Sequence, residues 1–204
     1  MIVIVDYGMG NLRSIQKSFQ RLHVDVSISS DRHVISNAKK LILPGVGHFA
    51  AGMKQLQEAN LLESLQQKVM IEKVPILGIC LGMQLFARKS EEGNANGLGW
   101  IDAEVIRFRV CDQKRFKVPH IGWNSIEVQK ESSLLQHWNQ DQLFYFVHSY
   151  HMTCNDPVDI LSTSVYDVRF VSAVQKGNIF GTQFHPEKSH RNGMQILKNF
   201  ADMG

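Results

Sequence analysis

The sequence has few cysteines and no long apolar run, and both absences narrow the class of protein. Its three cysteines, Cys80, Cys111 and Cys154, are odd in number and lack the spacing of metal ligands. This pattern argues against a disulfide framework and a zinc site, and it is typical of a reducing compartment. No apolar run approaches the roughly 18 residues that cross a membrane, and residues 1–6 do not resemble a signal peptide. We therefore expect a cytoplasmic protein without membrane contact, metal or other cofactor.

Strong charge of one sign is also absent. The formal net charge is only +3, and the densest basic stretch is Lys114-Arg115-Phe116-Lys117. Three cations in four residues are typical of a solvated loop, so we expect no nucleic-acid partner. A length of 204 residues with 44% hydrophobic residues suits one globular domain spanning residues 1–204.

The glycine loops that bind nucleotides are missing as well. Residues 6–11, Asp-Tyr-Gly-Met-Gly-Asn, come between an expected strand and an expected helix, as a dinucleotide-binding loop does. That fingerprint needs a third glycine where Arg13 stands, and the chain has no Gly-Lys-Ser/Thr for a phosphate loop. The segment predicts a tight strand-to-helix turn, with Asn11 at the start of the helix.

Strand and helix patterns alternate in the first half of the chain. The β-branched run at residues 2–5 is typical of a strand buried on both faces, and an apolar stripe at helical spacing follows from Leu12 to Leu22. The same patterns predict strands at 24–28, 41–43 and 75–79, and helices at 49–72, with a break near Asn60, and at 81–88. The alternation predicts an α/β fold with a mainly parallel central sheet flanked by helices.

The second half is richer in strands. Strands are expected at 103–108, 125–128, 143–147, 160–164, 170–175 and 179–184. Short connections between them indicate additional antiparallel or mixed sheet, and a helix at 193–203 closes the chain.

One segment at the end of a predicted buried strand has the form of a nucleophile elbow. Gly78-Ile79-Cys80-Leu81-Gly82 places a cysteine between two glycines where the strand gives way to a helix. The glycines permit a sharp turn that presents the Cys80 thiol above the sheet edge. The alternative is a cysteine that only packs in the core at a strand end.

A second segment supplies a base and a carboxylate. His185 follows a predicted strand, and Glu187 lies two residues further on. A histidine can take the thiol proton, and a carboxylate can hold the imidazole in its orientation. Since the chain has nine histidines, a surface or packing role is the alternative for any single one. The three residues together predict a Cys-His-Glu triad.

A third segment is Pro44-Gly45-Val46-Gly47-His48, directly after the strand at 41–43. The carboxyl ends of parallel strands meet at one edge of a sheet, so this turn can bring backbone N–H groups beside Cys80. An ordinary strand-to-helix turn explains the segment equally well.

Taken together, these segments resemble the class I, triad-type glutamine amidotransferases. The resemblance covers about residues 2–200 and rests on GICLGMQ and GTQFHPEKS. The motifs KVPHIGWN and YFVHSYH are similar to those of one branch, the glutaminase subunits of imidazole glycerol phosphate synthase. The fold implied is a single class I amidotransferase-like domain.

The resemblance implies a role for each matching residue. Cys80 attacks the side-chain amide of L-glutamine, His185 activates the water that frees glutamate, and Glu187 orients His185. The backbone N–H groups of Leu81 and, after a local rearrangement, Val46 form the oxyanion hole. The positions that bind the ends of glutamine are Gly47, Gln84, Glu92, Ser149 and Tyr150.

The residues themselves support one of these positions and leave a structural alternative for three others. Gln84 lies one helical turn after Cys80 and can face the same pocket. Glu92 is otherwise a solvated loop charge, and Ser149 and Tyr150 otherwise end a strand.

The resemblance also implies a partner. Ammonia released into water is mostly protonated and lost, so the family pairs this subunit with a (β/α)8-barrel cyclase, as a heterodimer. That partner makes imidazole glycerol phosphate and aminoimidazole carboxamide ribotide in histidine biosynthesis. Asn11, Trp123 and Lys188 match positions facing it, although Trp123 is otherwise ordinary core.

Three alternatives keep the same triad or the same fold. A paralogous glutaminase subunit supplies ammonia for sugar amidation in surface polysaccharide synthesis. A Cys-His-Glu hydrolase acts on γ-glutamyl peptides or other amides. A non-catalytic binding module uses the fold without its chemistry.

Overall fold

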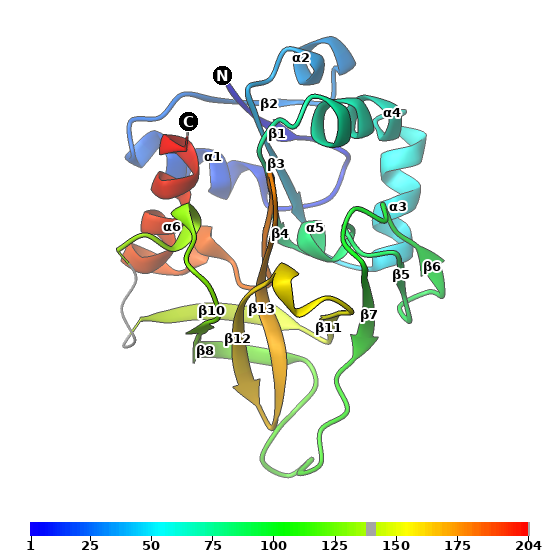
Figure 1. Cartoon of the computed structure of the whole chain (residues 1–204), viewed down its shortest axis with the longest axis vertical. Helices are drawn as coiled ribbons and strands as arrows, with labels where there is room; N and C mark the ends of the chain where they lie inside the picture. The colour runs from blue at the N-terminus through cyan, green and yellow to red at the C-terminus, as the bar shows by residue number, and fades with distance from the viewer. Residues whose placement is uncertain (138–141, 204) are drawn as a thin grey trace.

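The computed structural model describes residues 1–137 and 142–203 (Figure 1). Its main sheet has eight strands in the order β2-β1-β3-β4-β14-β13-β12-β9. The first five in that order run parallel, and β13, β12 and β9 are antiparallel. The bounds are β1 (Ile2–Val5), β2 (Val26–Ser29), β3 (Lys40–Gly45), β4 (Ile76–Cys80), β9 (Glu127–Val128), β12 (Ile160–Tyr166), β13 (Val168–Lys176) and β14 (Ile179–Thr182). The predicted α/β fold with antiparallel additions is confirmed.

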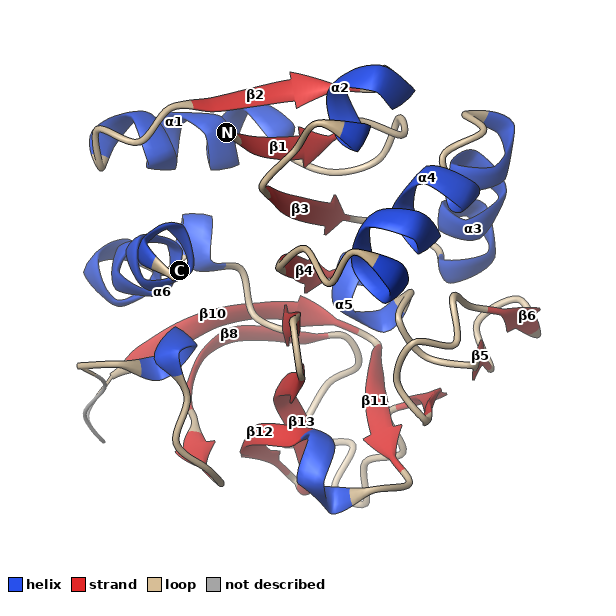
Figure 2. Cartoon of the chain, turned by 45° about the horizontal axis from the view of Figure 1, so that its top comes forward, coloured by secondary structure: helices blue, strands red, loops and turns tan. Residues whose placement is uncertain are grey.

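Helices cover both faces of the parallel part (Figure 2). Side chains alternate along a strand, so β1 sends Ile2 and Ile4 to one face and Val3 and Val5 to the other. The first pair packs with α1 and α6, and the second with α2, α3 and α4. The helices are α1 (Leu12–Arg21), α2 (Arg32–Ser36), α3 (Phe49–Glu58), α4 (Leu62–Gln66), α5 (Leu81–Gln84) and α6 (His190–Asp202).

Two smaller sheets complete the second half. One has the order β11-β7-β5-β6, formed by β5 (Lys89–Ser90), β6 (Ala95–Asn96), β7 (Ala103–Arg107) and β11 (Tyr150–Cys154). The other is an antiparallel pair, β8 (His120–Ser125) and β10 (Leu143–His148), here called the β8–β10 ribbon. Single turns of 3-10 helix lie at Ser133–Leu135, Pro157–Asp159 and Pro186–Lys188. No helix within the described ranges is long and apolar enough to cross a membrane.

Several element boundaries differ from the sequence prediction. The helical stretch at 49–72 does break at Asn60, whose φ is +56°, and it ends in a π-helical turn, Gln67–Ile71. The helix expected at 81–88 is wrong, because α5 stops at Gln84. The N–H groups of Phe86 and Ala87 donate to carbonyls three residues back, and the Arg88 N–H donates to the Ala103 carbonyl, so the α-helical bonding stops.

Other differences concern strands. The expected strand at 125–128 divides between the end of β8 and the short β9, and the strand expected at 179–184 ends at Thr182. The strands β5, β6 and β11, all of β8 except Ser125, and the helix α2 were not expected. Helix α6 begins three residues before its predicted start.

Candidate active site

Cys80 ends the buried strand β4 in a strained conformation. Its backbone has φ +55° and ψ −110°, and its side chain is buried. A residue other than glycine rarely has a positive φ, and such strain is common at functional sites. The elbow predicted from the sequence is therefore present, and its strain lies in the cysteine itself.

The flanking glycines have a different role from the one expected. Neither Gly78 nor Gly82 has a positive φ. A Cβ at Gly82 would lie 1.8 Å from the Leu43 carbonyl oxygen, and one at Gly78 would lie 2.6 Å from the Phe86 ring. The two glycines let neighbouring chain segments approach the elbow closely, since no larger residue fits.

A histidine and a carboxylate are paired next to this elbow. β14 runs parallel to β4, with Thr182 opposite Ile79, so the chain after β14 passes beside Cys80. His185 Nδ1 lies 2.8 Å from Glu187 Oε1, and both side chains are almost completely buried. The second oxygen, Glu187 Oε2, has no hydrogen-bond partner within the described ranges. The carboxylate therefore serves the imidazole alone.

The environment favours the protonated form of His185. Burial lowers the pKa of His185, but the Cys80 sulfur and the Glu187 carboxylate outweigh burial and raise it to about 10. Its Nε2 atom is buried and has no partner at direct hydrogen-bonding geometry in the part of the chain described here. The Cys80 sulfur is close enough to raise the pKa of His185, although Nε2 and the sulfur are not at hydrogen-bonding geometry. Such a pair can exist as thiolate and imidazolium.

Two buried glutamine amides connect the cysteine to the neighbouring sheet. Gln84 Nε2 donates to the Tyr150 carbonyl and to Gln183 Oε1, each at 2.9 Å. Gln183 Nε2 in turn lies 3.7 Å from the Cys80 sulfur. Gln183 was not predicted as a functional residue, although it stands two residues before His185 in the same motif.

The turn after β3 lies on the other side of the cysteine. β3 and β4 are neighbours, and Gly45 is paired with Cys80. Val46 follows at the sheet edge with 41% of its surface exposed, and Gly47 has φ +101°. The Tyr7 hydroxyl donates to the Pro44 carbonyl at 2.7 Å and so holds the start of the turn.

Cys80 and His185 line one cavity of about 410 Å³. It brings together ten of the predicted residues, namely Cys80, His185, Val46, Gly47, Leu81, Gln84, Glu92, Ser149, Tyr150 and Lys188. Glu187 contacts His185 but does not line the cavity. The size and the thiol suit a small amide substrate.

Comparison with known proteins identifies the family. The model of the family described as "Glutamine amidotransferase class-I" matches residues 3–203. The chain is 48% identical to imidazole glycerol phosphate synthase subunit HisH 2 of Methanococcus maripaludis, over 98% of both chains. It is 47% identical to subunit HisH 2 of Pseudomonas aeruginosa over the whole length of both. The chain belongs to the class I glutamine amidotransferases, among the HisH subunits.

Solved structures agree on the fold. A crystal structure of a glutamine amidotransferase superposes with a TM-score of 0.76, covering 100% of both chains at 19% identity. The structure of PurLQS from Thermotoga maritima gives a TM-score of 0.71 at 17% identity, covering 98% of this chain and 96% of that one.

Around the amidotransferase pocket, Glu92 has a structural contact as well. Its Oε2 atom accepts the backbone N–H of Phe49 at 2.8 Å, at the first residue of α3. It is therefore not a freely solvated loop charge, because it satisfies an N–H group at a helix start. Tyr150 begins β11, and the Ser149 carbonyl accepts the N–H of Phe108.

The three residues expected at the partner interface of this amidotransferase are exposed. Trp123 has 45% of its surface exposed and stacks on His190, with ring centroids 5.0 Å apart, so it is not ordinary core. Lys188 lies over the Tyr145 ring, 5.7 Å from its centroid. Asn11 occupies the N-cap of α1, but its side chain forms no cap hydrogen bond.

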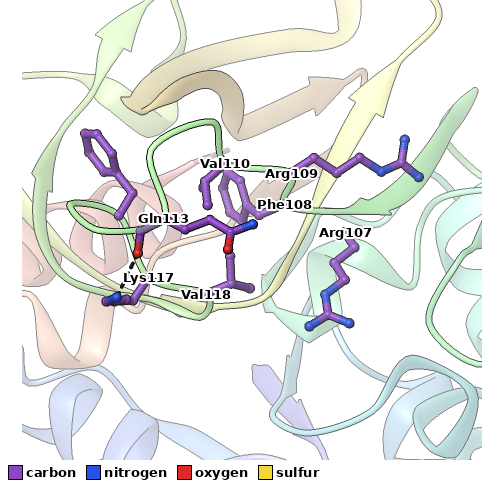
Figure 3. Close-up of a pocket in the computed structure, with 8 residues that line it drawn as sticks. Arg107, Phe108, Arg109, Val110, Gln113, Lys117 and Val118 are labelled. Atoms are coloured by element: carbon purple, nitrogen blue, oxygen red, sulfur yellow. Dashed lines mark hydrogen bonds between the residues drawn. The ribbon is translucent and has the colours of Figure 1, made fainter.

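A second hollow, of about 550 Å³, is lined by residues between Arg107 and Val118, and its polar side chains do not converge (Figure 3). The side chains of Arg107 and Arg109 point in different directions, and Arg109 is paired with Glu91 at 2.8 Å. Lys117 donates to the Gln113 carbonyl. Within residues 1–137 and 142–203, no group of His, Cys, Asp and Glu side chains is arranged to hold a metal.

Proposed function

We propose that the protein is the glutaminase subunit of imidazole glycerol phosphate synthase in histidine biosynthesis. It hydrolyses L-glutamine to glutamate and ammonia, and the ammonia passes to the cyclase subunit. The observation that carries this proposal is the strained Cys80 beside the buried His185–Glu187 pair, in one cavity. The similarity to HisH subunits over the whole chain supports it.

The first half of the reaction forms a thioester. The Cys80 thiolate attacks the side-chain amide carbon of glutamine, and the carbonyl oxygen becomes an oxyanion. The backbone N–H of Leu81 donates to that oxyanion, joined by the N–H of Val46 after its peptide reorients. The intermediate then collapses, the C–N bond breaks, and the His185 imidazolium gives its proton to the leaving ammonia.

The second half regenerates the cysteine. The now neutral His185 takes a proton from water as the water oxygen attacks the thioester carbon. The C–S bond breaks, glutamate leaves, and the thiolate–imidazolium pair returns. Glu187 does not exchange a proton, because its function is to orient His185 and to stabilise its charged form.

The remaining cavity residues bind the ends of glutamine. Glu92 already accepts Phe49 N–H with one oxygen, and its carboxylate faces the α-amino group of the substrate. Gly47, Gln84, Ser149 and Tyr150 complete the binding site with N–H, amide and hydroxyl groups.

Ammonia must reach its acceptor without escaping, which requires a docked partner. We assign that partner to a (β/α)8-barrel cyclase in a heterodimer. The docking surface is the outward face of the β8–β10 ribbon, where Ile121, Trp123 and Leu143 are each 45% exposed or more. Val147 on the same ribbon and Lys188 line the cavity, so the surface and the site adjoin. Asn11 extends the contact.

We assign residues 1–204 to one glutaminase domain that works in the cytoplasm. All three cysteines are free thiols, and a reducing compartment keeps the Cys80 nucleophile from forming a disulfide.

The test is glutamate release from L-glutamine by the chain alone and with the cyclase subunit and its nucleotide substrate. We expect low release alone and an increase of at least tenfold with the partner, abolished in Cys80→Ala. Equal release by Cys80→Ala contradicts the thiol mechanism, and full activity of the isolated chain contradicts the dependence on a partner.

A further inference from the structure

We propose that Gln183 is a further catalytic residue of this site, whose side-chain amide donates an N–H to the Cys80 sulfur and stabilises the thiolate. Gln183 is completely buried, and its Nε2 atom lies 3.7 Å from Sγ, which is within the range of an N–H···S hydrogen bond. The proposal deepens the proposed glutaminase function, because it concerns the same nucleophile.

Strand pairing explains how Gln183 reaches the sulfur. β14 ends at Thr182, opposite Ile79, so the next residues on the two strands are Gln183 and Cys80. The backbone N–H of Gln183 is held by the Ser172 carbonyl at 2.8 Å. Gln183 does not line the cavity, so its amide approaches the sulfur from the buried side. The opposite side stays open to glutamine.

The orientation of the amide follows from one fixed acceptor. The Tyr150 carbonyl oxygen can only accept, so Gln84 must turn its NH₂ group toward that oxygen, at 2.9 Å. The same NH₂ group donates to the Gln183 oxygen at 2.9 Å. A flipped Gln183 would place two NH₂ groups against each other. The Gln183 donor, and not its oxygen, therefore faces Cys80.

A buried histidine pair adds two further hydrogen bonds whose donor and acceptor are fixed. His148 Nδ1 lies 2.8 Å from the Tyr150 carbonyl, so that nitrogen carries the hydrogen. Its Nε2 atom must then accept from His120 Nδ1, 3.1 Å away. Burial lowers the pKa of His148 to about 3 and that of His120 to about 4, so both are neutral at pH 7. The hydrogen bond from His148 to the Tyr150 carbonyl, which orients Gln84, is therefore unchanged near pH 7.

Another polar neighbour of the sulfur is an acceptor. The Cys80 thiol can donate to the Val147 carbonyl at 3.9 Å, and that contact opposes the charge once the proton moves to His185. The Gln183 N–H offsets it. A neutral donor shifts the proton balance toward thiolate and imidazolium without adding a titrating group of its own.

The experiment measures the rate at which iodoacetamide alkylates Cys80 between pH 5 and 10. Peptide mass spectrometry separates Cys80 from Cys111 and Cys154. Gln183→Met removes both amide donors at similar length and adds no charge. We expect alkylation at pH 7 to slow about tenfold and its midpoint to rise by about one pH unit, since a bond to a charged group is lost. Gln183→Glu, which places a carboxyl group against the sulfur, slows it further.

Two further variants make the test decisive. Gln195→Met is the matched control, because that glutamine bonds Asn199 within α6, and it should alkylate as wild type. Gln84→Met leaves Gln183 in place but removes the donor that orients it, so we expect a smaller slowing. If Gln183→Met does not fold, as judged by its thermal midpoint, Gln84→Met decides, and a wild-type rate in that folded variant overturns the proposal.

The outcomes separate the two hypotheses, since the assay contains neither glutamine nor partner. A reactive wild-type Cys80 with an unchanged rate and midpoint in folded Gln183→Met overturns the role of Gln183 alone. A wild-type Cys80 that reacts no faster than Cys111 at pH 7 contradicts both this role and the proposed thiol chemistry.

Discussion

At the residue scale, the site depends on a strained cysteine, a buried imidazole–carboxylate pair and two oriented amides. The sequence predicted Cys80 and His185, because each stands at the end of a strand in a recognisable turn. It did not predict Gln183, because the contact with sulfur depends on the register of β14 against β4 and on the Gln84 rotamer. Neither is visible in a local pattern.

The charge state of His185 gives the first prediction. Glu187→Gln removes one of the two groups that raise the pKa of His185, so that pKa falls from about 10. Activity that requires the imidazolium is lost as pH rises through this pKa. We therefore expect the alkaline limb of kcat/KM to move at least one unit to lower pH, with kcat reduced about 100-fold or more. An unchanged alkaline limb would show that Glu187 does not control His185.

The close packing at the elbow gives the second prediction. A methyl group at Gly82 would overlap the Leu43 carbonyl oxygen, so Gly82→Ala should lower the free energy of unfolding by about 3 kcal/mol or more. Gly52→Ala, within α3, is the control, because the atoms nearest to its new methyl are the side-chain ends of Leu81 and Leu85, at 3.3–3.4 Å. Urea denaturation measures both, and equal stabilities would contradict this account of the glycine.

At the scale of elements, long-range hydrogen bonds set the end of α5 and the formation of β11, which local patterns do not predict. The apolar spacing after Cys80 predicts a longer helix, but the Arg88 N–H, which would continue it, donates to the Ala103 carbonyl instead. The residues of β11 are half polar, and they become a strand only by pairing with β7. Conversely, the buried β-branched and apolar strands of the parallel sheet were predictable, because their pattern does not depend on their neighbours.

The β8–β10 ribbon gives a prediction on pH. The folded pKa values of His120 and His148, about 4 and 3, lie below the ordinary value of 6.5. The unfolded chain then binds more protons, so stability is full above pH 6.5 and falls as pH decreases toward those values. Each histidine should cost about 2 kcal/mol of unfolding free energy by pH 5.

Variants test which histidines are responsible. His120→Phe keeps the ring stacked near Tyr166 and Phe146 but cannot titrate, so its stability should fall less between pH 7 and 5. His33→Gln, which changes an exposed histidine, should follow wild type. A wild-type pH dependence in His120→Phe would contradict the assignment.

At the scale of the whole molecule, the main sheet presents the nucleophile and the ribbon presents a surface beside it. The α/β class was predictable from alternating patterns. The separation of the ribbon from the main sheet was not, because strand patterns do not specify which strands pair. The apolar outward residues of the ribbon are the part of this surface that we expect a partner to cover.

Association with the cyclase subunit tests that expectation. Trp123→Asp should raise the dissociation constant at least tenfold, because a charge replaces an exposed aromatic at the centre of the surface. Ile71→Asp changes an exposed isoleucine in the π-helical turn, away from the ribbon, and should bind as wild type. Titration calorimetry measures both, and equal affinities would place the interface elsewhere.

The central claim is that Cys80 makes the ammonia that the cyclase subunit uses. The most direct measurement is imidazole glycerol phosphate formation by the complex, with either L-glutamine or an ammonium salt as nitrogen source. The account predicts that Cys80→Ala abolishes synthesis from glutamine and leaves synthesis from ammonium at the wild-type rate. Synthesis from glutamine that survives in Cys80→Ala would contradict it.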